Sequence, residues 1–512
     1  MLTLKKINEA INAISNSIDQ DKWIEALSGA EIILEELEKF NKNSTVLHLR
    51  FNLASQFIDA GTYLQNETAI SKGIKILEID SEYYEREFNI TYYYNLANGK
   101  LALANDCGYS KEKINFKNIE LFNTAKNLYW KAFKLIKEDE KYDLYQQNLI
   151  NLANILKQQF RFSEALQIYN IVIEKNTSYP QAWLNRSSCL EQFDNLLDHR
   201  TEKMIIEIIK GYDFACQSNQ IPNDWKPFYE NKSTYLRKQL GDNDLEKDEV
   251  ETLKEYSTMS HFRQWCINKN LTLNIHGLYC SCIANERDTL TLFDNIIATT
   301  GIKIYEQYLN RIKSEFSLLR HLYYESLHSD NSTTDYESCY SELYENEIIN
   351  LKNEKLRTCF RLCFSILDKL AIILCTFFKC TVQNNTSFNN FWFQNKNILD
   401  GLENPFLISI NSIIHDLNDK YGEFGFYKEW RNKLEHNLLF LIPDDYECLN
   451  DQDHMYIKIN HFENNLKNLI QITRSAIFST VFTLLHEYRK NESNDNLYKK
   501  IVIGKKNFDI ID

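Results

Sequence analysis

One short stretch of the sequence holds side chains that could cleave a phosphodiester. It reads Trp-Arg-Asn-Lys-Leu-Glu-His-Asn over residues 430–437, with an Asn directly after the Arg and a His five positions after it. Arg431 stays charged and can fork onto phosphate oxygens. His436 can exchange protons near neutral pH, because a histidine has an unperturbed pKa of about 6.5. The stretch therefore predicts acid–base chemistry on a phosphate.

Helical spacing would present these side chains on one side of a helix. Asn432 and His436 are four residues apart and share a face, and the long Arg431 side chain can reach the same cleft. Trp430, Leu434 and Leu438 are also four apart, on a different face that can anchor the helix in a core. The alternative is an ordinary exposed helix, on which Glu435 pairs with a nearby base and His436 lies at the surface.

Long amphipathic helices surround this stretch and must position it. Apolar stripes predict two long helices, over about 302–327 and 345–378, with a polar loop at 329–335 between them. A second loop is expected over 381–399, and two shorter helices over 406–417 and 426–441. The last long helix is expected over 461–488. Together these helices predict an antiparallel bundle.

The order of these features resembles a known family. A tyrosine-rich helix, the segment Asp-Lys-Leu-Ala beginning at Asp368, and the Arg431–His436 motif follow one another. This order is similar to a bacterial subfamily of the HEPN superfamily that follows tetratricopeptide-like repeats, and the resemblance covers about 260–490. It implies a metal-independent ribonuclease without cofactor. In that family two protomers usually pair, and the products are a 2′,3′-cyclic phosphate and a 5′-hydroxyl.

The resemblance also implies roles for single residues. His436 would transfer protons, Arg431 would bind the phosphate, and Asn432 would orient the phosphate or His436. Asp368 is a further candidate, which would orient Arg431 or His436 if the two helices pack together. A salt bridge at the helix surface is the equally open alternative for Asp368.

The first half of the chain carries a different helical pattern. Between 148 and 180, small and large apolar residues alternate at helical spacing on both sides of a turn near 159–162. This hairpin resembles the tetratricopeptide repeat, and weaker copies surround it. The sequence therefore predicts an all-α protein with a repeat domain at 1–255, a connector at 256–300 and a HEPN-like bundle at 301–512. A polar insertion is expected near 106–117.

Composition limits the choice of partners. The net charge of −13 lies entirely before residue 351, because 20 basic and 20 acidic residues follow it. RNA would therefore bind in a local basic cleft. The first residues do not resemble a signal peptide, and the longest apolar run, 370–378, is too short to span a bilayer. We expect a cytoplasmic protein that binds no membrane.

The densest group of metal-ligand residue types comprises Cys266, His276, Cys280 and Cys282. A zinc site is conceivable there, but the Cys-x-Cys spacing lacks the paired Cys-x-x-Cys of a zinc ribbon. We therefore expect reduced, buried thiols and no metal.

The sequence leaves three functions open. The first is a toxic or antiphage-defence endoribonuclease acting on tRNA or mRNA, with a peptide or protein partner on the repeat domain and a homodimer formed through the bundle. The second is an adaptor whose inactive bundle serves dimerisation or RNA binding. In the third, a nucleotidyltransferase antitoxin restrains the nuclease.

Overall fold

The computed structural model confirms the predicted all-α class. It describes residues 2–104, 119–136, 142–197, 200–241, 245–292, 300–328, 348–446 and 454–494. The predicted insertion near 106–117 and the predicted loop at 329–335 lie outside these residues. Helices make up nearly all regular structure of the described residues, beside one two-stranded sheet.

Contacts divide the chain into two compact units, Met1–Gln159 and Phe160–Asp512. The predicted domain boundaries at 255/256 and 300/301 do not coincide with this division. The predicted hairpin at 148–180 forms two helices, and the division falls in the turn between them. Its first helix therefore ends the first unit, and its second helix begins the second.

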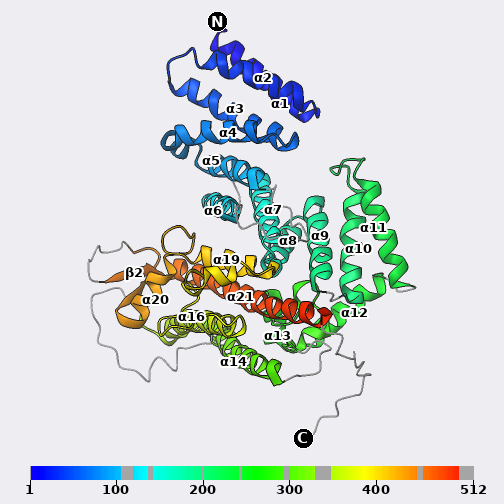
Figure 1. The fold of residues 1–512 in the computed structure, drawn as a ribbon, viewed down its shortest axis with the longest axis vertical. Coiled ribbons are helices and arrows are strands. Elements are labelled where there is room, and N and C mark those ends of the chain that lie inside the picture. Colours follow the sequence, from blue (N-terminus) through cyan, green and yellow to red (C-terminus); the bar gives the residue numbers. More distant parts are fainter. Residues whose placement is uncertain are drawn as a thin grey trace. The chain divides into compact units, whose positions relative to one another are not determined.

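The first unit is a series of helices that pack in chain order, which gives a helical-repeat fold (Figure 1). Three of its helices begin at side-chain caps, where Thr3, Asn43 and Asn66 accept a backbone N–H from the first turn. The helices are α1 (Leu4–Asp19), α2 (Trp23–Leu37), α3 (Ser44–Tyr63), α4 (Glu67–Ile79), α5 (Ser81–Ala104), α6 (Ile119–Leu135) and α7 (Tyr142–Gln158).

Small residues set the spacing of these helices. A Cβ added to Gly73 in α4 would lie 2.7 Å from the carbonyl oxygen of Ala54 in α3, so that the two backbones approach closely. Residues of the weaker repeat copies are buried, namely Leu53, Ala54, Phe57, Leu96, Ala97, Ala125, Tyr129 and Ala132. The assignment of these hairpins to the tetratricopeptide class stays a prediction.

The second unit begins with four further helices that pack in order along the chain. These are α8 (Phe162–Lys175), α9 (Pro180–Leu197), α10 (Glu202–Gln217) and α11 (Lys226–Leu240). Helix α12 (Leu245–Thr258) follows, and the predicted connector then contains α13 (His261–Asn268) and the short 3-10 helices η2 (His276–Leu278) and η3 (Ile283–Glu286). The described part of the charged segment at 242–254 lies in α12.

A helical bundle completes the second unit. Its helices are α14 (Thr300–His328), α16 (Leu351–Phe377), α19 (Pro405–Asp416), α20 (Tyr427–His436) and α21 (Ile459–Asn494). Helix α21 contacts α16 and α19 within the bundle, and it also contacts α8 and α9 (Figure 1). Part of α21, Ile459–Lys490, is long and apolar enough to cross a membrane, but 89% of its most apolar window is buried. This burial is that of a core helix.

Two sequence expectations in the bundle were wrong. The stretch at 381–399, expected as a loop, contains the one-turn helices α17 (Phe391–Gln394) and α18 (Lys396–Leu399). The helix expected over 426–441 ends at His436, and β1 (Leu439–Ile442) follows and pairs in parallel with β2 (Met455–Lys458). Pro443 comes directly after β1, and a proline disfavours helical conformation in the residue before it.

Candidate functional site

Helix α20 is fixed in the bundle by its aromatic residues. Trp430 is only 6% exposed and stacks on Phe462 of α21, with ring centroids 5.6 Å apart. The hydroxyl of Tyr427 donates to the backbone oxygen of Asn465 at 3.0 Å. These contacts hold one face of α20 against α21, and the opposite face is left for the polar residues of the motif.

Arg431 and Asp368 meet across α20 and α16. One guanidinium nitrogen of Arg431 lies 3.5 Å from a carboxylate oxygen of Asp368, and the guanidinium lies 5.5 Å from the ring centroid of Phe364. Asp368 also accepts the backbone N–H of Phe388 at 3.0 Å. Burial raises the pKa of Asp368, against the opposing effects of that N–H and of Arg431. The two helices thus bring together two residues that are 63 positions apart.

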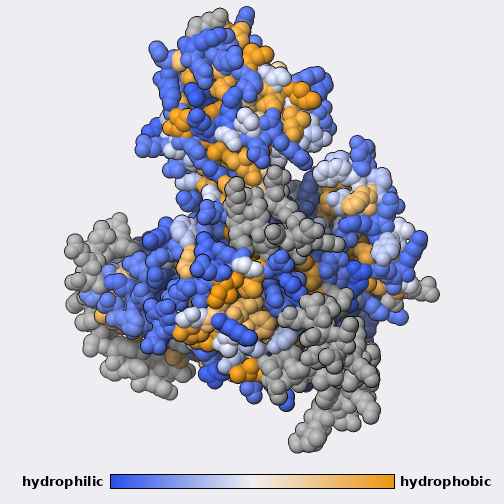
Figure 2. Space-filling model, in the orientation of Figure 1, coloured by the Kyte–Doolittle hydropathy of each residue, from blue (hydrophilic) through white to orange (hydrophobic). Residues whose placement is uncertain are grey.

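Asn432 and His436 lie on the exposed side of α20. Both side chains are exposed, and they are one helical turn apart. His436 is the last residue of the helix, because Asn437 has an extended backbone. Figure 2 shows mainly hydrophilic residues over this helix. The structure thus leaves the imidazole open to a ligand.

The predicted apolar anchor of α20 is only partly buried. Trp430 is buried and Leu434 is half-buried, but Leu438 lies beyond the helix end and is 55% exposed. The expectation that Leu438 anchors the helix was wrong, because the chain leaves the helix before it.

Two further basic residues lie on the same face of α16 as Asp368, and the sequence reasoning missed them. Arg357 and Arg361 precede Asp368 by eleven and seven residues, which places all three on one side of the helix. Arg357 donates to the backbone oxygen of Leu439 at 3.1 Å, just beyond the motif. Arg361 forms no ion pair within the described part of the chain. The spacing Arg-x3-Arg-x6-Asp was the available signal.

A family comparison covers this part of the chain. Residues 296–487 match the model of the LA2681-like HEPN family, which is less than half of the chain. A HEPN domain is present. No curated protein and no solved structure matches the chain.

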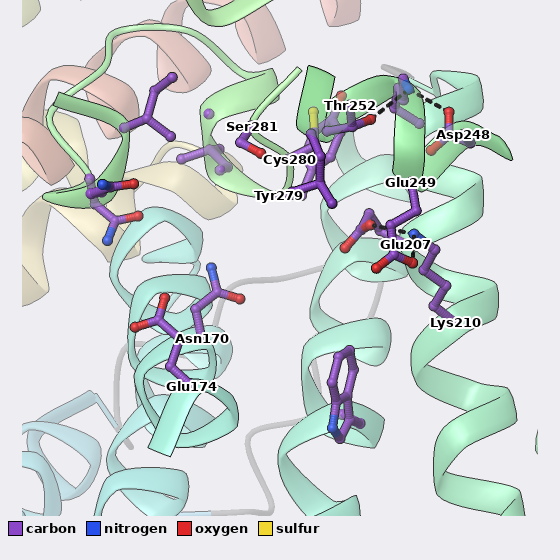
Figure 3. A pocket seen from close by; sticks show the side chains of 18 residues that line it. Asn170, Glu174, Glu207, Lys210, Asp248, Glu249, Thr252, Tyr279, Cys280 and Ser281 are labelled. Atoms are coloured by element: carbon purple, nitrogen blue, oxygen red, sulfur yellow. Dashed lines mark hydrogen bonds and ion pairs between the residues drawn. The ribbon is translucent and has the colours of Figure 1, made fainter. Parts of the chain in front are cut away.

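The HEPN domain contains all four predicted site residues, on α16 and α20. It begins a few residues before the predicted start at 301. A separate cleft of about 420 Å³ lies outside the matched range, because its lining residues fall between Asn170 and Ser281 (Figure 3). The motif on α20 and this cleft are therefore distinct places on the second unit.

Proposed function

We propose that the HEPN domain is a metal-independent endoribonuclease with Arg431 and His436 at its centre. The observation that carries the proposal is the arrangement on α20. An arginine held beside Asp368 and an exposed histidine share one short helix in a HEPN domain.

The proposed reaction is attack of a ribose 2′-hydroxyl on the adjacent phosphate. His436 takes the hydroxyl proton or gives one to the leaving 5′-oxygen. The planar guanidinium of Arg431 binds the phosphate oxygens, on which negative charge grows in the transition state. Products with a 2′,3′-cyclic phosphate and a 5′-hydroxyl follow, and no water enters the first step.

Asn432 and Asp368 would position the reacting groups. Asn432 is one turn from His436 on the same face, where its amide can orient the phosphate or the imidazole. Asp368 holds one nitrogen of Arg431 and leaves the other donors of the guanidinium for the substrate. Asp368 is thus a positioning residue in this proposal.

The biological role that fits this chemistry is that of a toxin or antiphage-defence effector acting on tRNA or mRNA in the cytoplasm. The helical repeats of the first unit would sense a trigger or bind a protein partner, since stacked hairpins commonly offer an extended binding surface. Two HEPN domains would pair so that two motifs face one substrate.

One observation favours a second function, that of an adaptor whose HEPN domain dimerises or binds RNA without cleaving it. The Arg431–Asp368 contact and the contact of Arg431 with Phe364 are also what a purely structural arginine would make. In that case His436 has no chemical task.

The test is incubation of purified wild-type protein and His436→Ala with total cellular RNA in EDTA, followed by mapping of the new ends. We expect cleavage by wild type alone, with cyclic phosphate ends. His261→Ala is the matched control, because His261 is exposed on α13, outside the matched domain. Equal cleavage by the His436 variant, or cleavage that needs added Mg²⁺, would contradict the proposal.

A second test applies if the purified enzyme does not cleave RNA because its activity is restrained. Expression of wild type should then arrest growth, and His436→Ala should not. Toxicity that is the same for both proteins supports the adaptor.

A further inference from the structure

Three metal-ligand side chains converge in the connector before the HEPN domain. His276, Cys280 and Cys282 place one ligand atom each within 4.8 Å of one another. The Nδ1 atom of His276 lies 3.8 Å from the sulfur of Cys280 and 3.5 Å from that of Cys282. The two sulfurs are 3.0 Å apart. We propose that these residues bind a thiophilic divalent cation, of which Zn²⁺ is the fitting example.

The two nitrogen–sulfur distances suit a zinc site, and the sulfur–sulfur distance lies between that of a zinc site and that of a disulfide. Tetrahedral zinc with usual bond lengths separates a sulfur from a nitrogen ligand by about 3.6 Å and two sulfurs by about 3.8 Å. The two nitrogen–sulfur distances are close to that value. The sulfurs are about 0.8 Å closer than in such a site and must separate when the cation binds. A disulfide would need them at about 2.05 Å.

Backbone N–H groups donate to both sulfurs. The N–H of Ala284 donates to the sulfur of Cys282, and the N–H of Cys282 donates to that of Cys280. The neighbouring Cys282 side chain and burial nevertheless raise the pKa of Cys280, whereas hydrogen bonds lower the pKa of Cys282, so only Cys282 favours the thiolate before a cation binds. Both thiols give up their protons when the cation binds.

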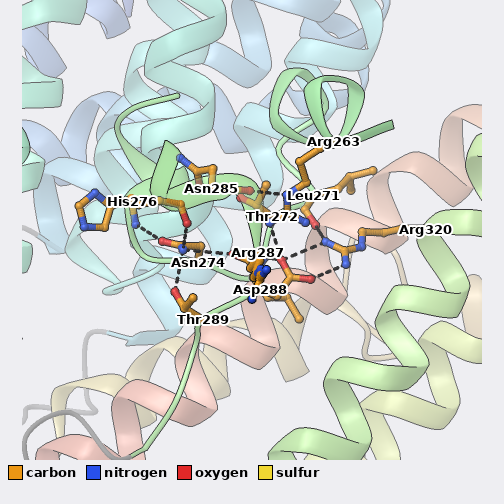
Figure 4. A network of polar contacts seen from close by, with 12 residues as sticks. Arg263, Leu271, Thr272, Asn274, His276, Asn285, Arg287, Asp288, Thr289 and Arg320 are labelled. Atoms are coloured by element: carbon orange, nitrogen blue, oxygen red, sulfur yellow. Dashed lines mark hydrogen bonds and ion pairs between the residues drawn. The ribbon is translucent and has the colours of Figure 1, made fainter. Parts of the chain in front are cut away.

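Buried amides hold the loop that carries the ligands. The side chain of Asn285 donates to the backbone oxygens of Cys280 and Cys282, at 2.9 and 3.3 Å. The side chain of Asn274 accepts the N–H of His276 at 2.8 Å and donates to the hydroxyl of Thr289 at 2.7 Å. Figure 4 shows the side chain of Asn274 between His276 and Thr289. A site whose ligands are already oriented loses less entropy on binding.

The same loop is fastened to the HEPN domain. Asp288 pairs with Arg320 of α14 and with Arg263 of α13, the latter at 3.0 Å (Figure 4). Arg320 also donates to the backbone oxygen of Leu271 at 2.8 Å. A cation bound at 276–282 would therefore stiffen the connector directly ahead of α14.

The fourth coordination position is left for solvent. The group contains three ligand atoms among the described residues, whereas structural zinc sites usually have four from the protein. Cys280 lines the cleft of about 420 Å³ (Figure 3). Cys266, the other cysteine of the sequence cluster, is buried near Arg320 and Arg263 and is not a ligand.

The experiment measures metal content of the full-length protein, purified under reducing conditions and incubated with Zn²⁺ followed by desalting. We expect one zinc per chain in wild type and in Cys216→Ser, a matched control whose sulfur lies on α10. Cys280→Ser and Cys282→Ser should lose it. Replacement by Co²⁺ should give visible bands of a tetrahedral ion and thiolate charge transfer in wild type.

Two results would overturn the site. One is a wild-type protein that retains no zinc and shows no cobalt spectrum while both thiols react as free groups. The other is equal zinc in wild type and both serine variants. Because these readouts involve no RNA, they are independent of the proposed nuclease.

Discussion

At Arg431, the effect of positive charge on RNA cleavage can be measured apart from the effect of the planar guanidinium. Arg431→Lys keeps the positive charge but removes the planar fork that can bind Asp368 and a phosphate together. We expect RNA cleavage to fall by about 10²- to 10³-fold, the usual effect of losing a transition-state donor. Initial rates on a defined RNA would measure it. Retention of more than half of the wild-type rate would show that only charge matters.

At Asp368, the effect on the orientation of Arg431 can be measured apart from the effect on the stability of the fold. Burial raises its pKa above the ordinary 3.8, so the folded protein binds this proton more tightly than the unfolded chain does. The ionised carboxylate therefore costs stability at neutral pH, and this cost declines as the pH falls through the raised pKa. Asp368→Asn should melt at the wild-type temperature or above it at pH 7, with the difference shrinking as the pH is lowered.

Cleavage by the same variant should nevertheless decline by about tenfold to a hundredfold, because Arg431 loses the partner that orients it. Thermal melts and cleavage rates on one preparation would measure both effects. A variant that loses melting temperature and activity together would indicate that Asp368 is structural.

At the residue scale, sequence spacing predicted which residues share a helix face, but it did not predict contacts between residues far apart in the chain. The spacing of Asn432 and His436 placed both on one face of a helix, because that depends only on helical geometry. The contact of Asp368 with Arg431 depends on how α16 packs on α20, and only the family resemblance suggested it. The sequence grouped His276 with Cys280 and Cys282 but favoured buried thiols over a metal site, because spacing alone does not show that a turn at 276–280 brings the three side chains together.

At the element scale, a buried ion network joins α8 to α19. Arg161 is 1% exposed, pairs with Glu164 at 2.6 Å, and also pairs with the fully buried Asp416. Arg161→Met would remove the cation that pairs with both carboxylates, and breaking a buried pair costs about 3–5 kcal/mol. Urea unfolding would measure the loss.

The control is Arg237→Met, whose pair with Asp213 is half exposed. It should change the free energy of unfolding by less than about 1 kcal/mol. Equal effects of the two variants would show that the Arg161 network does not stabilise the joint between α8 and α19.

The apolar periodicity of the sequence predicted where the helices lie, but it did not predict where they end. The long helices α14, α16 and α21 were expected within a few residues, except for the start of α16 and the end of α21, which each differ by six residues. The end of α20 was missed, because Leu439–Ile442 continues an apolar pattern that suits a helix or a strand equally. The division of the predicted hairpin at Gln159/Phe160 was also missed, since contacts far along the chain decide it.

At the scale of the whole molecule, charge restricts where RNA can bind. The chain carries a net charge of −13, and residues 351–512 are neutral. A polyanion is therefore repelled by most of the protein and attracted only where arginines gather. Among the described residues, the face of α16 that carries Arg357 and Arg361 is such a place, although Arg357 also pairs with Glu354.

Arg361 provides the test of this local binding. In the background of His436→Ala, which should bind RNA without cutting it, Arg361→Ala should weaken binding to single-stranded RNA at low salt. Each lost phosphate contact also lowers the slope of log affinity against log salt by about 0.7. Arg311→Ala is the control, because that side chain is 69% exposed on α14 and pairs with Glu315. If both variants keep the parent slope, RNA binds away from α16, and the proposed site on α20 loses its electrostatic support.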